Sequence, residues 1–299
     1  MKKYFMINII ICLFIITLSS VSFSKQHEDA QDNIVYTSIY PIEFVVHQLI
    51  GEKITVRSIY PPGVDAHTYE PTLHETINIA NGDAFIYLGA NMEGFVDQLA
   101  KTLHQAQVNL IEIGKHPELF ETNKGRDKDP HIWLDPLRMI KMGAIIKNKL
   151  IDIYPQYEQS IASNFKKLKD KLLKLDQKYQ TIMSQKNDPE IIVSHAAFGY
   201  LEDRYNIKQI AISGLSASNE PSQKKLTRIL QLAEKKDMKY VLFEKNTANR
   251  LSTIVQEQIG AKSLYLHNLE VLMTEDINKR EDYFSLMRKN LKILDEATQ

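Results

Sequence analysis

The chain has 299 residues, which is enough for one or two globular domains with substantial hydrophobic cores. Hydrophobic residues make up 43% of it and charged residues 25%, a composition typical of a folded rather than a disordered protein. Lysine plus arginine and aspartate plus glutamate balance at 37 each, so no excess positive charge favours nucleic acid or acidic lipid. We therefore expect no nucleic-acid partner.

The N-terminus has the pattern of a secretory signal peptide. Lys2 and Lys3 precede an apolar stretch from Ile7 to Leu18, and small and polar residues follow as far as Ser24. We expect residues 1–24 to be a signal peptide cleaved after Ser24, and residues 25–33 to be a flexible leader. The alternative is an uncleaved membrane anchor, because the apolar region approaches the ~20 residues that a span requires.

The only cysteine, Cys12, lies inside this apolar stretch and would be removed with it. The mature chain would then have no thiol, which excludes a disulfide framework and a cysteine-based metal site. Any metal site must therefore use histidines and carboxylates.

Residues 34–154 predict an N-terminal α/β lobe, because β-rich runs alternate with helical patterns. Thr72 and Glu75 form a capping box at the start of one helix. Asp135 is a good N-cap for another, and Pro136 suits its first position. The predicted strands are 34–38, 54–59, 84–88 and 108–113, and the predicted helices are 41–50, 72–81, 95–104 and 136–153.

Segment 155–187 predicts a long linking helix, from about residue 156 to residue 185. Its apolar residues follow one another at alternating steps of four and three: Ile161, Phe165, Leu168, Leu172, Leu175, Tyr179 and Ile182. Such a helix is about 45 Å long and is interpreted as a rigid spine along two lobes. The alternative is the seam of a coiled-coil dimer; we expect a monomer.

Residues 188–299 repeat the pattern of the first lobe at an offset of about 150 residues. Strands are predicted at 190–194, 207–212, 240–243 and 262–266, with a helix at 197–205 and another after Glu220-Pro221-Ser222. The predicted fold is therefore α/β, with two similar lobes of mainly parallel sheets joined by a long rigid helix. A metal site is expected in the cleft between the lobes.

Histidines lie where ligand sites form in open parallel sheets, beyond the carboxyl ends of strands. His67 and His195 have this placement, and His267 and Glu270 both follow the last predicted strand, while His131 enters beside the strands of the first lobe. Three imidazoles with one carboxylate suit Zn²⁺, whereas Mn²⁺ favours more oxygen ligands. The remaining histidines are interpreted as structural or surface residues: His27, His47, His74, His104 and His116.

Four motifs in order resemble those of the zinc-type solute-binding proteins of ABC importers. They are Tyr60-Pro-Pro-Gly-Val-Asp-Ala-His-Thr-Tyr-Glu-Pro71, Asp129-Pro-His-Ile-Trp-Leu-Asp-Pro136, Ser194-His-Ala-Ala-Phe-Gly-Tyr-Leu201 and Gly214-Leu-Ser-Ala-Ser-Asn-Glu-Pro-Ser222. Phe243-Glu244 and residues 259–263 also look like the family pattern. The resemblance covers almost the whole predicted mature chain.

The resemblance implies a two-lobed fold that holds one metal ion. His67, His131 and His195 match the family's three histidine ligands. Glu270 matches the glutamate of its Asn-Pro-Leu-Glu motif and is the expected fourth ligand, while His267 stands where other members carry an aspartate. Manganese-type relatives place a glutamate at the position of His195.

We expect an exported, non-enzymatic protein that captures Zn²⁺ as transported substrate and delivers it to an ABC permease. We expect it in the periplasm or at the outer face of the cytoplasmic membrane. A manganese-binding homologue, a surface adhesin of the same fold and a zinc hydrolase are alternatives. Zinc binding should weaken as the imidazoles protonate below about pH 6.

The sequence departs from the family in two respects. Residues 116–128 contain one histidine instead of a histidine-rich loop, which argues against metal capture by such a loop. Cys12 lacks a small residue before it, which argues against a lipid anchor.

Overall fold

The computed structural model describes residues 33–121, 128–246 and 250–299. Asn33–Gln299 form one compact unit. The predicted signal peptide, Cys12, His27 and all of the predicted leader except Asn33 lie outside the described residues.

None of the helices in the described ranges is both long and apolar enough to cross a membrane.

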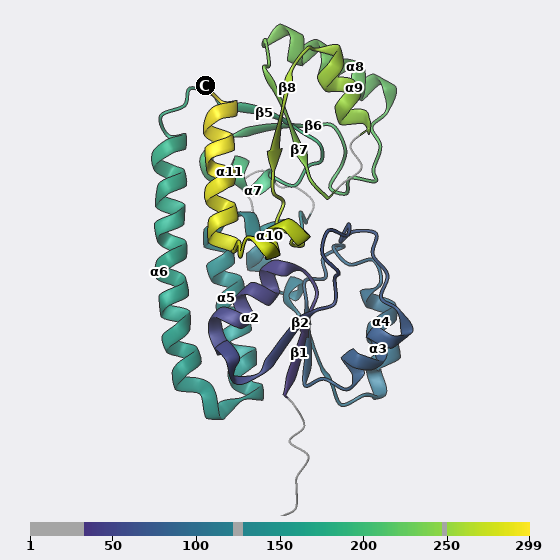
Figure 1. Cartoon of the computed structure of the whole chain (residues 1–299), viewed down its shortest axis with the longest axis vertical. Coiled ribbons are helices and arrows are strands. Elements are labelled where there is room, and N and C mark those ends of the chain that lie inside the picture. The colour runs from purple at the N-terminus through teal and green to yellow at the C-terminus, as the bar shows by residue number, and fades with distance from the viewer. Residues whose placement is uncertain (1–32, 122–127, 247–249) are drawn as a thin grey trace, which may run out of the picture. The chain divides into compact units, whose positions relative to one another are not determined.

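The first lobe is built on a four-stranded parallel sheet with the order β2-β1-β3-β4. Its strands are β1 (Ile34–Thr37), β2 (Thr55–Ser58), β3 (Ala84–Tyr87) and β4 (Asn109–Glu112). Its helices are α2 (Tyr40–Ile50), α3 (Leu73–Ala80), α4 (Val96–Thr102) and α5 (Pro136–Ile153). Helices α2 and α5 lie on one side of the sheet, and α3 and α4 on the other (Figure 1).

The second lobe repeats this topology with the order β6-β5-β7-β8, again all parallel. Its strands are β5 (Glu190–Val193), β6 (Lys208–Ala211), β7 (Tyr240–Glu244) and β8 (Lys262–Leu266). Its helices are α7 (Gly199–Tyr205), α8 (Gln223–Lys235), α9 (Arg250–Gln258), α10 (Thr274–Asn278) and α11 (Tyr283–Ala297). The predicted α/β class with two similar lobes is confirmed.

Short 3₁₀ turns join several of these elements. They are η1 (Gly51–Lys53), η2 (Leu103–Gln105), η3 (Ile113–Lys115), η4 (Pro117–Leu119), η5 (Ile132–Leu134) and η6 (Pro155–Tyr157).

The helix starts predicted from local sequence are present. The Glu75 amide donates to the Thr72 hydroxyl over 3.2 Å, and the Thr72 amide donates to the Glu75 carboxylate over 2.6 Å, which completes the capping box of α3. Asp135 caps α5 by accepting from the Leu137 amide at 2.8 Å, with Pro136 in the first turn. These contacts satisfy backbone N–H groups that have no partner inside the helix.

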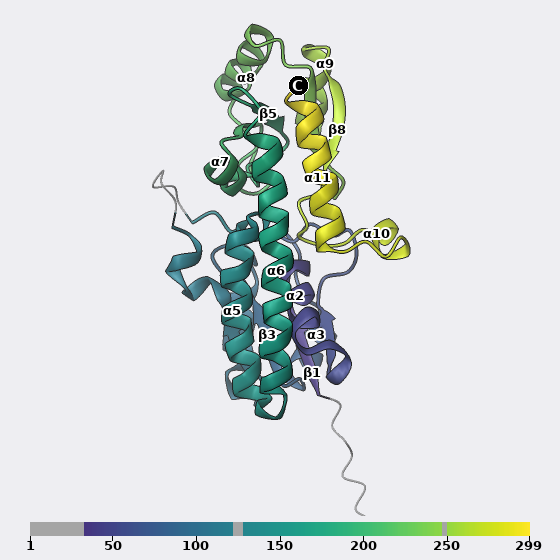
Figure 2. The ribbon, with the colours of Figure 1, turned by 90° about the vertical axis from the view of Figure 1, so that its left-hand side faces the viewer.

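Helix α6 (Glu158–Met183) runs along both lobes (Figure 2). Its 26 residues give a length of about 39 Å. It packs against α2 and α5 of the first lobe and against α11 of the second. Its buried face consists of Ile161, Leu168, Leu172, Leu175, Tyr179 and Met183. Because this face is covered within one chain, it is not the seam of a coiled-coil dimer.

Helix α11 is a second connection between the lobes, and it was not predicted from the sequence. The Tyr283 ring stacks on Phe44 of α2 with centroids 5.4 Å apart, and the Tyr283 hydroxyl donates to the Trp133 carbonyl over 2.7 Å. The Tyr179 hydroxyl of α6 donates to the Met287 carbonyl over 2.6 Å. The lobes are therefore joined by two helices that share one apolar core, and not by α6 alone.

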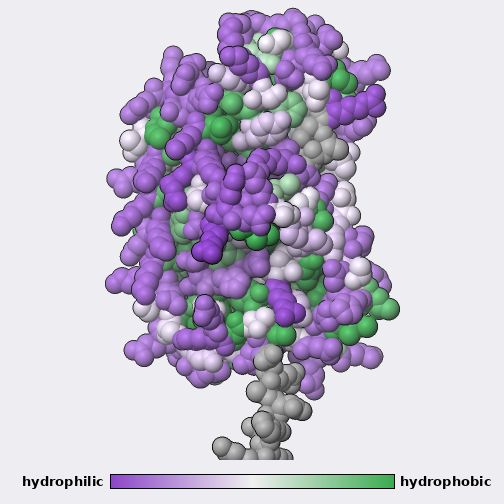
Figure 3. Space-filling view, viewed as in Figure 1, coloured by the Kyte–Doolittle hydropathy of each residue, from purple (hydrophilic) through white to green (hydrophobic). Residues whose placement is uncertain are grey.

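Apolar side chains are concentrated in the core that the two lobes share with helices α6 and α11. The face seen in Figure 3 is mostly hydrophilic, and its hydrophobic side chains form small separate areas. A second, smaller apolar cluster lies between the second sheet and α8 and α9.

Two adjacent leucines of α6 test this packing. Leu172 is fully buried, whereas Leu173 is 42% exposed. We expect Leu172→Ala to lower the free energy of unfolding by about 2–5 kcal/mol, because it leaves a cavity in the core. Leu173→Ala should change it by less than about 0.5 kcal/mol. Urea denaturation followed by circular dichroism measures both, and equal losses would contradict the assigned face.

Candidate metal centre

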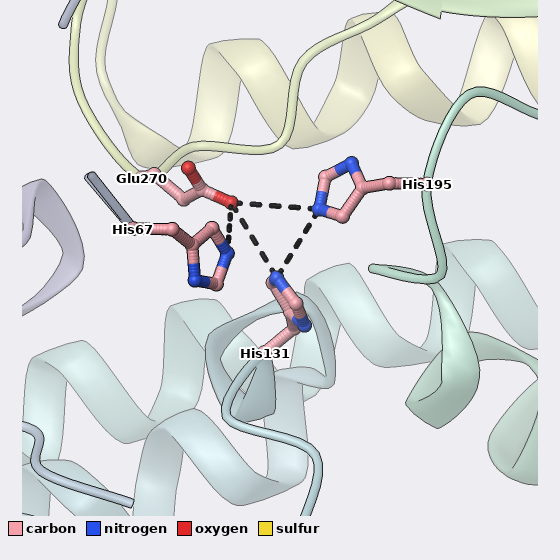
Figure 4. Close-up of side chains that lie close together, drawn as sticks. All are labelled: His67, His131, His195 and Glu270. Carbon is pink, nitrogen blue, oxygen red and sulfur yellow. Dashed lines mark hydrogen bonds and ion pairs between the residues drawn. The ribbon is translucent and has the colours of Figure 1, made fainter. Parts of the chain in front are cut away.

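Four side chains converge between the carboxyl ends of the two sheets (Figure 4). His67 lies in the loop after β2, and His131 lies immediately before η5 in the first lobe. His195 follows β5, and Glu270 lies in the loop after β8 in the second lobe. Strand ends of parallel sheets leave their following loops free to build such sites. Each lobe therefore supplies two of the four groups.

The nitrogen and oxygen atoms of this cluster lie close enough to share one ion. The Nε2 atoms of His131 and His195 are 3.3 Å apart. Oε1 of Glu270 lies 3.4 Å from Nε2 of His131, 3.6 Å from Nε2 of His67 and 3.7 Å from Nε2 of His195. One such atom from each of the four residues falls within 4.8 Å of all the others.

These separations match a tetrahedral zinc site. Zn–N bonds of ~2.0–2.1 Å and tetrahedral angles place ligand atoms about 3.3–3.4 Å apart. His131, His195 and Glu270 are fully buried, and the His67 side chain is 7% exposed. Nε2 of His67 and both carboxylate oxygens of Glu270 are buried without a hydrogen-bond partner in the described ranges. Buried polar atoms of this kind fit a site that binds a cation.

Two carboxylates orient the imidazoles of His131 and His195. Nδ1 of His131 lies 2.7 Å from Oδ1 of Asp129, and Nδ1 of His195 lies 2.7 Å from Oε1 of Glu244. A carboxylate accepts only, so each Nδ1 carries a proton, and in the neutral imidazole the lone pair of Nε2 faces the centre. This is the usual arrangement behind metal-bound histidines.

No role was predicted for Asp129 or Glu244, although both lie in sequence motifs that resemble those of the family. Glu244 is the last residue of β7, and His195 follows β5, the strand that pairs with β7. Neighbouring parallel strands end side by side, so the two side chains meet. The position of Glu244 at a strand end was therefore a signal that sequence reasoning could have used.

The loop that carries His67 is fixed by contacts on both sides. The His67 amide donates to Oδ1 of Asp65 over 2.9 Å, and the Tyr60 hydroxyl donates to the Ala66 carbonyl over 3.1 Å. Gly63 turns the chain with a φ of 78°, a conformation that favours glycine. Its amide donates to the Leu272 carbonyl over 3.0 Å, which links this loop to the segment that carries Glu270.

Glu270, and not His267, lies with the three histidines. Nε2 of His267 is 3.0 Å from Oδ2 of Asp276, and its Nδ1 accepts from the Leu269 amide at 2.9 Å. Both ring nitrogens of His267 are thus engaged outside the cluster. The turn at Leu269, with a φ of 59°, separates the two side chains.

The other described histidines do not join the cluster. His47, His74 and His104 are exposed, and His116 is partly buried beside Glu118. This agrees with their interpretation as structural or surface residues.

The charges in the cluster are coupled. Burial lowers the pKa of the His131 imidazole, but Asp129 and Glu270 outweigh this effect and raise it above its ordinary value. Burial also lowers the pKa of His195, and the Glu244 carboxylate raises it overall. For Glu270, burial raises the pKa, but the imidazoles of His131 and His67 lower it well below its usual range. Without metal, protonated imidazoles therefore compensate the Glu270 carboxylate.

The fold and this buried cluster define a two-lobed solute-binding protein with a site of the size of a single ion. Residues 35–297 match the family described as zinc-uptake complex component A, periplasmic (ZnuA). The chain belongs to this family.

Two curated relatives show how far the similarity extends. The chain is 33% identical to the zinc-binding lipoprotein AdcA of Streptococcus pneumoniae over all of its own length, but spans only 61% of AdcA. It is 28% identical to the high-affinity zinc uptake system protein ZnuA of Bacillus subtilis, covering 96% of this chain and 94% of that protein.

A solved structure agrees in fold. The Zn(II)-bound ZnuA-like domain of S. pneumoniae AdcA superposes with a TM-score of 0.76 at 34% identity. The match covers 89% of this chain and 99% of that domain.

The raised pKa values predict proton release when zinc binds. A protonated imidazole has no free lone pair, so Zn²⁺ must displace its proton. Although burial lowers the pKa of His131, Asp129 and Glu270 raise it to about 10, so its proton is still bound at pH 7 and Zn²⁺ must displace it there. We expect titration calorimetry at pH 7, in buffers of different ionisation enthalpy, to show net proton release. Binding without proton release would contradict the charge state described here.

Proposed function

We propose that this chain is an exported binding protein that captures Zn²⁺ through His67, His131, His195 and Glu270 and delivers it to an ABC permease. The observation that carries the proposal is a buried cluster in which three imidazole nitrogens lie 3.4 to 3.7 Å from one carboxylate oxygen and all four ligand atoms lie within 4.8 Å of one another. Membership of the zinc-uptake family supports both the metal and the transport role.

The donor set supports zinc over manganese as the substrate. Three of the four proposed donors are imidazole nitrogens, and only Glu270 offers oxygen. Mn²⁺ prefers carboxylate, carbonyl and water oxygens in higher coordination numbers, whereas imidazole suits Zn²⁺. His195 is central to this preference, since it offers a nitrogen at the position where manganese-type relatives place a glutamate.

The same donor set supports binding rather than catalysis. Catalytic zinc sites use three protein ligands and leave a fourth position for water or substrate. Here Glu270 would fill the fourth tetrahedral position, and all four groups are buried or nearly so. A zinc-bound water that could attack a substrate then has no place.

Division of the ligands between the lobes supports capture and release. His67 and His131 belong to the first lobe, and His195 and Glu270 to the second. If the lobes separate, the coordination set splits into two pairs and loses most of its affinity. A permease that binds the separated lobes more tightly would therefore lower zinc affinity at the membrane.

Histidine substitutions test the proposed ligand set. We expect His131→Ala to weaken zinc binding by more than about 100-fold, since loss of even an outer-shell partner commonly costs 10–100-fold. His104→Ala is the matched control, because His104 is an exposed histidine outside the cluster. Competition with a zinc chelator of known affinity measures both variants. Equal zinc affinity of the wild type and His131→Ala would remove His131 from the ligand set.

Growth under zinc limitation tests delivery. In a host strain that lacks its own zinc-binding protein of this family, the wild-type chain and His104→Ala should restore growth and uptake of radioactive zinc. His131→Ala should restore neither. If His131→Ala restored growth and zinc uptake, transport would not depend on this site.

A further inference from the structure

We propose that Asn268 is a positioning residue that holds three of the four ligand-bearing segments in register and thereby sets the preference for Zn²⁺ over Mn²⁺. This inference rests on the proposed function. Asn268 lies two residues before Glu270, is 1% exposed and is not one of the four proposed ligands.

The side-chain amide of Asn268 joins His195 to Glu270. Its Nδ2 donates to Oε2 of Glu244 over 2.9 Å, while the other oxygen of Glu244 is 2.7 Å from Nδ1 of His195. Its Oδ1 accepts from the Glu270 amide at 3.2 Å. One buried amide therefore holds the carboxylate that orients His195 and the backbone that places Glu270.

The backbone carbonyl of Asn268 reaches the other lobe. It accepts from Nε1 of Trp133 at 2.7 Å. Trp133 lies in η5, and its ring centroid is 5.4 Å from that of His131. This hydrogen bond crosses between the lobes next to the cluster, so it ties the segment of His131 to those of His195 and Glu270.

The backbone beyond Asn268 needs such support. Leu269 has a φ of 59°, in the left-handed region that a branched side chain rarely adopts. A conformation of this kind persists only where surrounding contacts hold it. The amide of Asn268 on one side and Nδ1 of His267 on the other fix the backbone N–H groups of Glu270 and Leu269.

Metal preference follows from this rigidity. A fixed set of three nitrogens within 3.7 Å of one carboxylate oxygen, and all within 4.8 Å of one another, fits a small tetrahedral ion. If the Glu270 segment becomes mobile, the carboxylate can bind through both oxygens and water can enter. Both changes favour Mn²⁺, which prefers more oxygen donors. Loss of Asn268 should therefore weaken zinc binding more than manganese binding.

Asn268→Ala and Asn290→Ala form a matched pair. Asn290 is a similarly buried asparagine of α11, and its side-chain hydrogen bonds among the described residues join it to the amide and carbonyl of His267 in the same loop. We expect Asn268→Ala to weaken Zn²⁺ binding about 10- to 100-fold and to lower the ratio of Zn²⁺ to Mn²⁺ affinity. Asn290→Ala should lower the melting temperature without changing that ratio.

Trp133→Phe provides a second test, because it removes the indole N–H donor and keeps an aromatic side chain, although the smaller ring also leaves a cavity in the core. It should reduce the Zn²⁺ to Mn²⁺ ratio in the same direction, by a smaller factor. Circular dichroism of the metal-free variants confirms folding, and competition titrations with each metal give the affinities. A wild-type chain that fails to bind zinc would refute the proposed function. A zinc-binding wild type whose metal ratio is unchanged in Asn268→Ala and Trp133→Phe would overturn this inference alone.

Discussion

The buried carboxylate of Glu270 is the constraint on which the rest of the site depends. An ionised carboxylate inside a protein is unfavourable unless opposite charge or hydrogen bonds compensate it. Neither oxygen of Glu270 has a hydrogen-bond partner in the described parts of the chain, and three imidazole nitrogens lie within 3.7 Å of Oε1. The compensating charge comes from protonated imidazoles in the free protein, and we propose that Zn²⁺ supplies it in the loaded one. Proton and metal thus compete for the same space.

The surrounding architecture keeps this competition local. Asp129 and Glu244 hold the outer nitrogens of His131 and His195, so the inner nitrogens face the centre whichever cation is present. The two sheets place these pairs because neighbouring parallel strands end at the same edge. The resulting site is rigid within each lobe, while its two halves can part only if the lobes move.

Two helices control how the lobes are held together. Helix α6 spans both, and α11 adds aromatic packing and hydrogen bonds across the boundary through Tyr283. A single helix would allow the lobes to twist about its axis, whereas two helices that share an apolar core resist this motion. The hydrogen bond from Trp133 to Asn268 adds a further connection beside the proposed metal site.

Much of this protein could be predicted from its sequence, because the relevant signals are local or periodic. Alternating strands and helices indicated two similar parallel-sheet lobes, Thr72 and Asp135 marked helix starts, and His67 and His195 stood beyond strand ends. Three features depended on the tertiary structure. The packing of α11 on α2 relies on residues such as Phe44 and Tyr283 that are far apart in the chain. The choice of Glu270 over His267 relies on the turn at Leu269, which residues from other elements stabilise. The pairing of Glu244 with His195 relies on strand order, since contacts between distant segments exist only once the sheet has formed.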